Sequence, residues 1–266
     1  MRTRIMGFGM AAMLISLAHA NCGLEHCPLH HGESEHSHSV SLNTNHTSFN
    51  LDSAAGRYEA VTVGYTYMGF PHWLLGGNLS AIALRVGSET EYGISNPLLF
   101  ASWFTRWNPE GVVYLGLQLE LPLGNEHAGM ASHHFMVAPY VLMEQSFGSA
   151  FGNASLGYSQ AVSLHEHEES EIHPLYVNPH EDQEILYRMG TGLRQNAGRF
   201  KEQVYLDGRY APGDLELSLG RHHLCVGALL EAALGKRLAA GPKVELPLIS
   251  PKRFDWKAGL EVKGVF

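Results

Sequence analysis

Two cysteines and five histidines lie within the stretch NCGLEHCPLHHGESEHSHS, residues 21–39. Thiolate sulfur and imidazole nitrogen are ligands that suit Zn²⁺, Cu²⁺ and Ni²⁺. The candidate ligands in this tail are Cys22, His26, Cys27, His30, His31, His36 and His38. Their spacing is not that of a zinc finger, which has two separated ligand pairs. The tail therefore predicts capture of a transition-metal ion as a bound or transported species, with no cofactor required otherwise.

Two other interpretations of the tail stay open. Cys22 and Cys27 can close a small disulfide loop in an oxidising compartment, which would remove both thiols from a metal site. The histidine-rich run can also be a polar low-complexity segment without a specific ligand.

A second histidine-rich stretch, SLHEHEESEIHPLYVNPHED, covers residues 163–182. Its histidines are His165, His167, His173 and His180, and they lie among glutamates and an aspartate. The His-x-His spacing of the first two places both rings on one side of an extended segment. This stretch is a second candidate metal site, and the alternative is an ordinary acidic loop.

The first twenty residues, MRTRIMGFGMAAMLISLAHA, have two arginines, an apolar run and a final Ala-His-Ala. This three-part pattern is typical of a secretory signal peptide cleaved after Ala20. An N-terminal membrane anchor is less consistent, because the apolar run from Ile5 to Leu17 is shorter than the roughly 20 residues of a spanning helix. Acylation at Cys22 is a further alternative. We expect residues 1–20 to be the signal peptide and residues 21–50 to form the tail, which can include a first strand from residue 38.

The composition limits the function. The net charge is −8, which gives no reason to expect a nucleic-acid partner. Three cysteines are too few for a disulfide framework. No later segment approaches the roughly 18 consecutive apolar residues of a transmembrane helix candidate.

The remaining sequence alternates between apolar and polar residues. In FDWKAGLEVKGVF, residues 254–266, the even positions are apolar or glycine and most odd positions are charged or glycine. A period of two is the signature of a β-strand with one apolar face. The same alternation occurs in VVYLGLQLELPLG (112–124), DLELSLG (214–220) and VELPLI (244–249).

A soluble β-sandwich and a transmembrane β-barrel both produce this alternation. Long strands favour the barrel, because a tilted membrane crossing takes about 9–11 residues. Aromatic residues at expected strand ends, such as Trp103, Phe104, Phe254 and Trp256, favour it too, since they suit an interfacial girdle. The terminal Phe266 resembles the signal read by the barrel assembly machinery of Gram-negative bacteria. We therefore predict an all-β antiparallel barrel over residues 51–266, located in the outer membrane and in contact with its lipid.

Turn residues and connection lengths give a strand count. The expected strands are 57–69, 75–87, 92–106, 111–122, 133–146, 149–163, 183–197, 200–211, 214–234, 236–248 and 252–266. Barrels of this kind normally have an even number of strands, so a twelfth is expected over 38–51. Short joins near 107–110, 147–148, 197–199 and 235–236 are assigned to the periplasmic side, and the long ones to the outside.

The polar faces of these strands predict the residues that line the barrel. They are Gln118, Glu120, Asp214, Glu216, Lys243, Glu245, Asp255, Lys257, Glu261 and Lys263. Both signs of charge are present, so the side chains can pair inside a narrow lumen. Structural filling and a weakly selective pore are both consistent with this set.

The segment GISNPLLFASWFTRWNPEGVVYLGLQLELPLGNEHAG resembles the centre of the outer-membrane channels of the phenol meta-pathway degradation type. The similarity lies in Gly93 to Pro97 and in the Leu-Pro-x-Gly turn from Leu121 to Gly124, and Asn96 stands where those proteins more often have Asp. The resemblance implies an outer-membrane barrel that passes small molecules. It implies no catalytic residue.

The resulting hypothesis is a non-enzymatic channel or envelope binding protein for small solutes, with transition-metal ions as the specific prediction. Alternatives are a channel for small aromatic or apolar solutes, a metal buffer without conductance, and an outer-membrane lipid hydrolase. The hydrolase would use Ser132 with His133, or Ser163 with His165, but no GxSxG motif is present.

Overall fold

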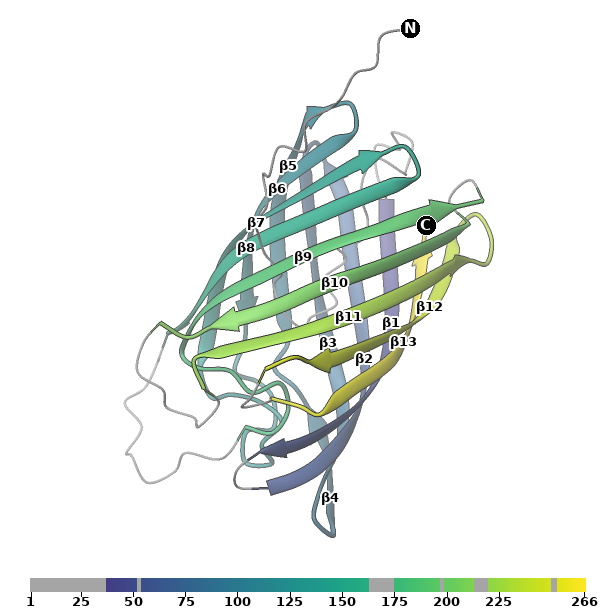
Figure 1. Ribbon diagram of the computed structural model, residues 1–266. Coiled ribbons are helices and arrows are strands. Elements are labelled where there is room, and N and C mark those ends of the chain that lie inside the picture. The colour runs from purple at the N-terminus through teal and green to yellow at the C-terminus, as the bar shows by residue number, and fades with distance from the viewer. Residues whose placement is uncertain (1–36, 52–53, 163–174, 197–198, 213–219, 250–252) are drawn as a thin grey trace, which may run out of the picture.

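The protein is all-β, as shown by a computed structural model that describes residues 37–51, 54–162, 175–196, 199–212, 220–249 and 253–266 (Figure 1). The strands are β1 (Ser37–Leu51), β2 (Ala54–Phe70), β3 (Trp73–Val86), β4 (Glu89–Ile94), β5 (Leu98–Asn108), β6 (Gly111–Glu120), β7 (Phe135–Phe147), β8 (Ala150–Val162), β9 (Gln183–Gln195), β10 (Phe200–Tyr210), β11 (His222–Ala233), β12 (Leu238–Pro247) and β13 (Trp256–Val265). Within the described ranges, no helix has the length and apolarity to cross a membrane.

The sheet closes on itself. β1 pairs antiparallel with β2 on one side and with β13 on the other, where Ser39 lies opposite Val265. From β5 to β13 each strand pairs with the next in sequence order. The pairings of β5 with β3 and of β3 with β2 complete the ring. β1 is the strand expected over 38–51, so the barrel includes the end of the segment assigned to the tail.

The thirteen strands occupy twelve positions around the barrel, because β4 and β5 both pair with β3. The predicted twelve-stranded antiparallel barrel is therefore confirmed. The expectation of one continuous strand over 92–106 is wrong, since the chain is irregular from Ser95 to Pro97. Proline lacks the N–H that a sheet ladder needs, and it ends the regular pairing there.

The two ends of the barrel differ. Both described chain ends lie at the end with the short turns, while the longer connections gather at the opposite end (Figure 1). At the first end β5 and β6 are joined by two residues, 109–110, and β7 and β8 by two residues, 148–149. At the other end the connections include 121–134 and 211–221; the strand expected from 214 begins at His222, and residues 213–219 lie outside the described part.

The predicted alternation is confirmed along the described strands. On β6, Leu115 and Leu117 are exposed while Gln118 is buried. On β13, Leu260 is exposed while Lys257 and Glu261 are buried. Apolar side chains thus face outwards and polar ones face the interior, which is the reverse of a soluble protein and the arrangement of a barrel in lipid.

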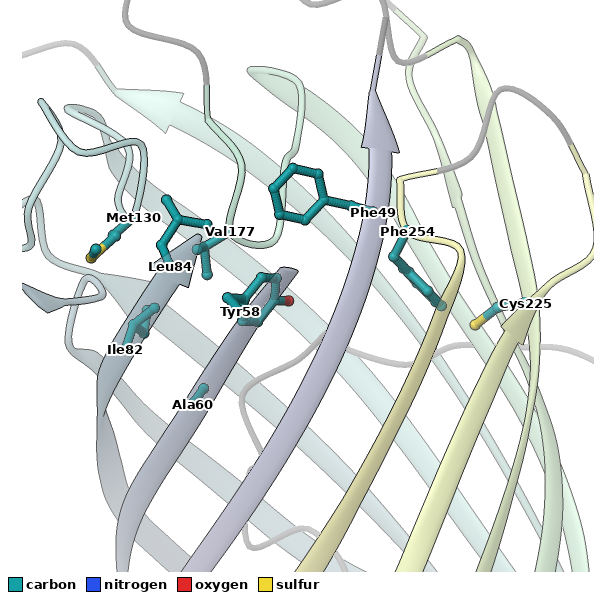
Figure 2. Close-up of a cluster of buried hydrophobic side chains, with 9 residues drawn as sticks. All are labelled: Phe49, Tyr58, Ala60, Ile82, Leu84, Met130, Val177, Cys225 and Phe254. Carbon is teal, nitrogen blue, oxygen red and sulfur yellow. The ribbon is translucent and has the colours of Figure 1, made fainter. Parts of the chain in front are cut away.

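Two aromatic residues expected at an outer girdle face inwards instead. Phe254 is 5% exposed and lies in the interior cluster of Figure 2, next to Cys225. It precedes the first residue of β13, Trp256, so the strand alternation does not apply to it. Phe104 packs inside against Tyr114, with ring centroids 5.7 Å apart.

Inward aromatic rings lie over glycines on the neighbouring strands. The directly opposed pairs are Phe49–Gly56, Phe100–Gly76, Tyr140–Gly116, Phe151–Gly192 and Tyr205–Gly227. A Cβ atom on Gly227 would lie 2.1 Å from Cζ of Tyr205, so glycine is needed for the ring to lie flat. This arrangement keeps large rings close to the wall and leaves interior space.

Candidate solute pathway inside the barrel

One arc of the interior, formed by β9–β13, carries paired charges. The Arg188 guanidinium donates to Asp207 at 3.0 Å across the β9–β10 ladder. Glu245 pairs with both Lys243 at 2.8 Å and Lys257 at 3.2 Å. Because these residues alternate with lipid-facing ones, the strand pleat alone brings them inside, while the register decides which of them meet.

The ladder continues towards the short-turn end. Lys263 lies 3.0 Å from Glu261 and 3.3 Å from Glu231. In each pair the opposite charges lie within contact distance, so the arc presents little net charge to the lumen.

A second charged network lies at the end with the long connections. The Glu184 side chain is 1% exposed. Its carboxylate forms ion pairs with Nη1 of Arg209 at 3.2 Å and with Nη2 of Arg253 at 2.5 Å. Arg209 also donates to Oδ1 of Asn178 at 3.0 Å, and Arg253 donates to the Pro179 carbonyl at 2.7 Å. Burial lowers the pKa of the Arg253 guanidinium from its ordinary value, and the Glu184 charge opposes that shift. The network anchors the connection 175–182 to the barrel wall.

The connection 121–134 is anchored by Asn96, in the break between β4 and β5. The Asn96 amide donates to Glu120 at 3.0 Å and to the Ser132 carbonyl at 2.8 Å. Its Oδ1 accepts the Gly124 N–H at 3.0 Å. An aspartate at this position has no N–H to donate to Glu120, which gives a physical reason for asparagine here.

The two connections meet inside the mouth of the barrel. The Gly129 carbonyl accepts the N–H groups of Tyr176 at 2.9 Å and Val177 at 3.1 Å. Met130 and Val177 pack with Tyr58 of β2 and with Phe254, which precedes β13, in one apolar cluster (Figure 2). The described parts of these connections therefore narrow the barrel at the end with the long connections.

The wall beside the charged arc, formed by β1 and β2, is uncharged in its described inward residues. The inward residues of β1 are Ser37, Ser39, Ser41, Asn43, Asn45 and Thr47, and β2 adds Thr62 and Thr66. The next arc, from β3 to β6, is apolar and aromatic towards the short-turn end, where Leu74, Leu98 and Phe100 form one cluster and Val112 and Tyr114 another. A solute in the lumen thus meets hydroxyls and amides, aromatic rings and paired charges on different sides.

A cavity of ≈ 120 Å³ lies beneath the two connections. Its lining combines Asn45 and Thr62 from the uncharged wall and Gln118 from β6 with Glu184, Arg209 and Lys257 from β9, β10 and β13. Gln118 is 7% exposed, and its Oε1 has no hydrogen-bond partner in the described protein. This space has the polar lining that a small hydrated or hydrogen-bonding solute requires.

The residues expected in the lumen fall into three groups. Gln118 and Glu120 line the cavity, and Lys243, Glu245, Lys257, Glu261 and Lys263 form the ion pairs above. Asp255 precedes β13, where its N–H bonds the Ser48 carbonyl, so it is not in a strand position. Asp214 and Glu216 lie outside the described residues.

Most of the expected metal ligands also lie outside the described residues: Cys22, His26, Cys27, His30, His31, His36, His165, His167 and His173. His38 faces outwards on β1, where Nδ1 lies 2.7 Å from the Tyr65 hydroxyl. His180 lines the cavity. In the part of the chain that the structure describes, no group of three or more His, Cys, Asp or Glu is arranged to hold a metal ion.

Several interior charges are not among those expected from the sequence, notably Glu184, Arg188, Asp207, Arg209 and Arg253. A signal for two of them was present, because Asp207 and Arg209 alternate with Val204, Leu206 and Gly208 on β10. Arg253 and Glu184 lie at or beyond strand ends, where alternation carries no information.

No family model matches the sequence, and no curated protein matches it either. Solved structures match in fold. An outer membrane channel from Pseudomonas putida F1 has a TM-score of 0.65 at 11% identity, covering 87% of this chain and 95% of that one. The NanC porin has a TM-score of 0.55 at 6% identity, over 85% of this chain and 98% of that one. The KdgM porin has a TM-score of 0.52 at 10% identity, over 86% and 99%.

At these identities the likeness concerns the fold alone. The closed barrel, its outward apolar belt and its polar interior are shared features of that architecture. The chain therefore has the fold of an outer-membrane β-barrel of the channel and porin kind.

Proposed function

We propose that the protein is a narrow channel for small solutes in the outer membrane of a Gram-negative bacterium, reached after removal of the signal peptide 1–20. The observation that carries the proposal is the cavity inside a closed, lipid-compatible barrel, lined by polar groups on one side and by ion pairs on the other. The phenol-pathway resemblance and the channel and porin folds support the same function.

The interior predicts a small conductance with weak charge selectivity. The connections 121–134 and 175–182 narrow the outer mouth, and interior lysines and arginines lie beside carboxylates. Charge-selective filters are built from rings of side chains of one sign. The paired charges of this interior form no such ring.

Planar-bilayer recording tests this prediction. The refolded protein is expected to give discrete small steps, with cation and anion permeabilities of similar size. Folding is checked in the same sample by the shift of unheated barrel on a gel. A folded barrel that stays electrically silent contradicts the channel function.

A second candidate solute class rests on the apolar arc. Leu98, Phe100 and Tyr114 present apolar and aromatic surface to the interior, which suits small aromatic or apolar solutes. Vesicle permeation of phenol against a sugar of similar size distinguishes the classes. A Phe100→Ser variant is expected to slow the aromatic solute selectively if this arc guides it.

Metal capture by the tail and by residues 163–182 is a separate proposal that rests on the sequence. Titration of Zn²⁺ and Cu²⁺ into the protein, beside a variant lacking residues 21–39, tests it. Tight binding that disappears with the tail supports metal capture; equal or negligible binding by both proteins contradicts it. The lipid-hydrolase alternative is tested by Ser132→Ala, which would abolish any lipase activity that depends on that hydroxyl.

The proposed partners follow from the same location. They are outer-membrane lipid on the apolar belt, solutes or metal ions in the lumen, and the barrel assembly machinery at the C terminus. Phe266 is 66% exposed, and its backbone pairs with that of His38 at 2.8 and 3.1 Å, so its ring is accessible at the closing seam of the barrel.

A further inference from the structure

Two arginines lie side by side on the outer face of the barrel. Arg57 of β2 is directly opposite Arg85 of β3 in the antiparallel ladder. Both are exposed and alternate with inward residues such as Tyr58 and Leu84. Like charges directly opposite each other destabilise a strand pair unless something compensates them.

Nearby acids do not supply that compensation. Arg57 forms only a long ion pair with Glu59, whose Oε1 is 4.0 Å from its Nε, and the same oxygen lies 3.1 Å from Nδ1 of His46. Glu59 lies on β2, two residues after Arg57, and so is not next to Arg85 on the β4 side. The residue opposite Arg85 on β4 is Thr90. Among the described residues, the Arg85 side chain forms no ion pair or hydrogen bond.

The cross-strand register extends the arginine pair into a row of hydrogen-bond donors. Ser48 lies opposite Arg57, and Thr90 lies opposite Arg85. On the far side of Ser48 is Trp256, exposed on β13. With neighbouring strands about 4.8 Å apart, two hydroxyls and two guanidinium groups face outwards along four successive strands.

The height of this row on the barrel places it at a membrane interface. On β2 the outward residues run from Arg57 and Glu59 through Val61 and Val63 to Tyr65 and Tyr67 at the short-turn end. Ten residues of strand rise about 33 Å, or about 25 Å along the membrane normal at the usual tilt, which equals the height of the apolar belt. Arg57 therefore lies at the headgroup level opposite the aromatic end.

We propose that this row, named here the arginine row (Ser48, Arg57, Arg85 and Thr90), binds the phosphate of an anionic lipid in the outer leaflet. Guanidinium groups bind phosphate oxygens with paired hydrogen bonds, and the hydroxyls add donors on both sides. Trp256 supplies the amphipathic ring that sits at the headgroup boundary. The inference rests on the proposed outer-membrane location and adds a ligand on the outside of the barrel.

The test compares lipid binding by three forms of the full protein in detergent, measured by native mass spectrometry with bisphosphorylated lipid A. The wild type is expected to bind, and Arg57→Gln with Arg85→Gln is expected to weaken binding by about tenfold or more. The matched control, Arg106→Gln with Arg237→Gln, removes two exposed arginines near the short-turn end. Its binding is expected to equal that of the wild type.

Two further arms identify the source of the phosphate. Lipid A without phosphates is expected to bind the wild type no better than it binds the arginine variant, and excess inorganic phosphate is expected not to displace the lipid. Equal binding by the wild type and the arginine variant overturns the proposal, as does equal loss in the control variant. Complete displacement by inorganic phosphate overturns the lipid assignment.

Conductance of the same samples separates this proposal from the channel function. Conducting barrels that do not bind lipid A contradict only the lipid site. Barrels that bind lipid A but remain silent contradict only the channel.

Discussion

Glu184 shows how single residues set the shape of the barrel mouth at the end with the long connections. Its carboxylate lies between the guanidinium groups of Arg209 and Arg253, which in turn hold Asn178 and the Pro179 carbonyl. Removing one partner of a buried ion pair leaves the other charge buried without compensation. The resulting loss of folding stability exceeds the stability that the intact pair contributes.

Replacing Glu184 with Gln is therefore expected to destabilise the barrel by about 3 kcal/mol, because two buried arginines lose their carboxylate. The same change frees the connection 175–182 and is expected to raise conductance. Urea unfolding in lipid vesicles and bilayer recording measure the two effects. The control is Glu202→Gln, since Glu202 is exposed and bonds only Gln195 among the described residues; an equal effect in both variants would refute this role.

At the scale of elements, the ring-on-glycine pairs explain how a narrow barrel accommodates large inward side chains. Tyr205 lies over Gly227, and its hydroxyl donates to Glu245 at 2.8 Å. The Arg188 guanidinium stacks on the same ring, 4.2 Å from its centroid. A ring held flat in this way supports the charged arc without blocking the lumen.

Gly227→Ala is expected to displace the Tyr205 ring into the lumen, because the added Cβ would lie 2.1 Å from Cζ. We expect a loss of about 1–3 kcal/mol of stability, as for other overpacked sites, together with a lower conductance. Gly235→Ala is the control, since no atom lies within 4 Å of the Cβ added there. A Gly227→Ala barrel with unchanged conductance would show that the ring does not need the glycine.

Strand interruption is also an element-scale feature. Pro97 lies in the irregular break between β4 and β5, the two strands that pair with β3. In this break the Asn96 side chain points inwards and bonds Glu120, Ser132 and Gly124. The break in the wall is thus where the connection 121–134 is attached.

At the scale of the whole molecule, the belt of outward apolar side chains defines which part of the barrel lies in the lipid. Val63 is 53% exposed in the middle of β2, between the arginine row and the aromatic end. Its exposure is explained by lipid contact rather than by water.

A Val63→Arg substitution is expected to destabilise the protein in bilayers by about 2–4 kcal/mol, the cost of a cation near the membrane midplane. Leu234→Arg serves as the control, because Leu234 is 64% exposed and follows the last residue of β11, in the connection to β12 at the short-turn end. Reversible urea unfolding in vesicles provides both values. Equal costs at the two positions would contradict the assigned belt.

The sequence by itself determined the barrel, the number of strand positions and much of the inner face. Lys257 and Glu261 alternate with outward residues in the sequence, and the structure buries both, because a strand pleat has a period of two, which is a local property. Local patterning also identified the paired signs of charge in the lumen. It failed at Phe254 and Phe104, and it left Glu184 and Arg253 undetected, because strand ends and connections have no such period.

Only the tertiary structure decided which side chains meet. The register that brings Arg57 beside Arg85, and the inward path that brings Val177 to Gly129, join residues far apart in the sequence. Such contacts depend on closure of the whole ring, where a shift of one residue would exchange the inner and outer faces. The lumen charges were readable from the chain, but their pairing and the narrowed mouth arise from that closure.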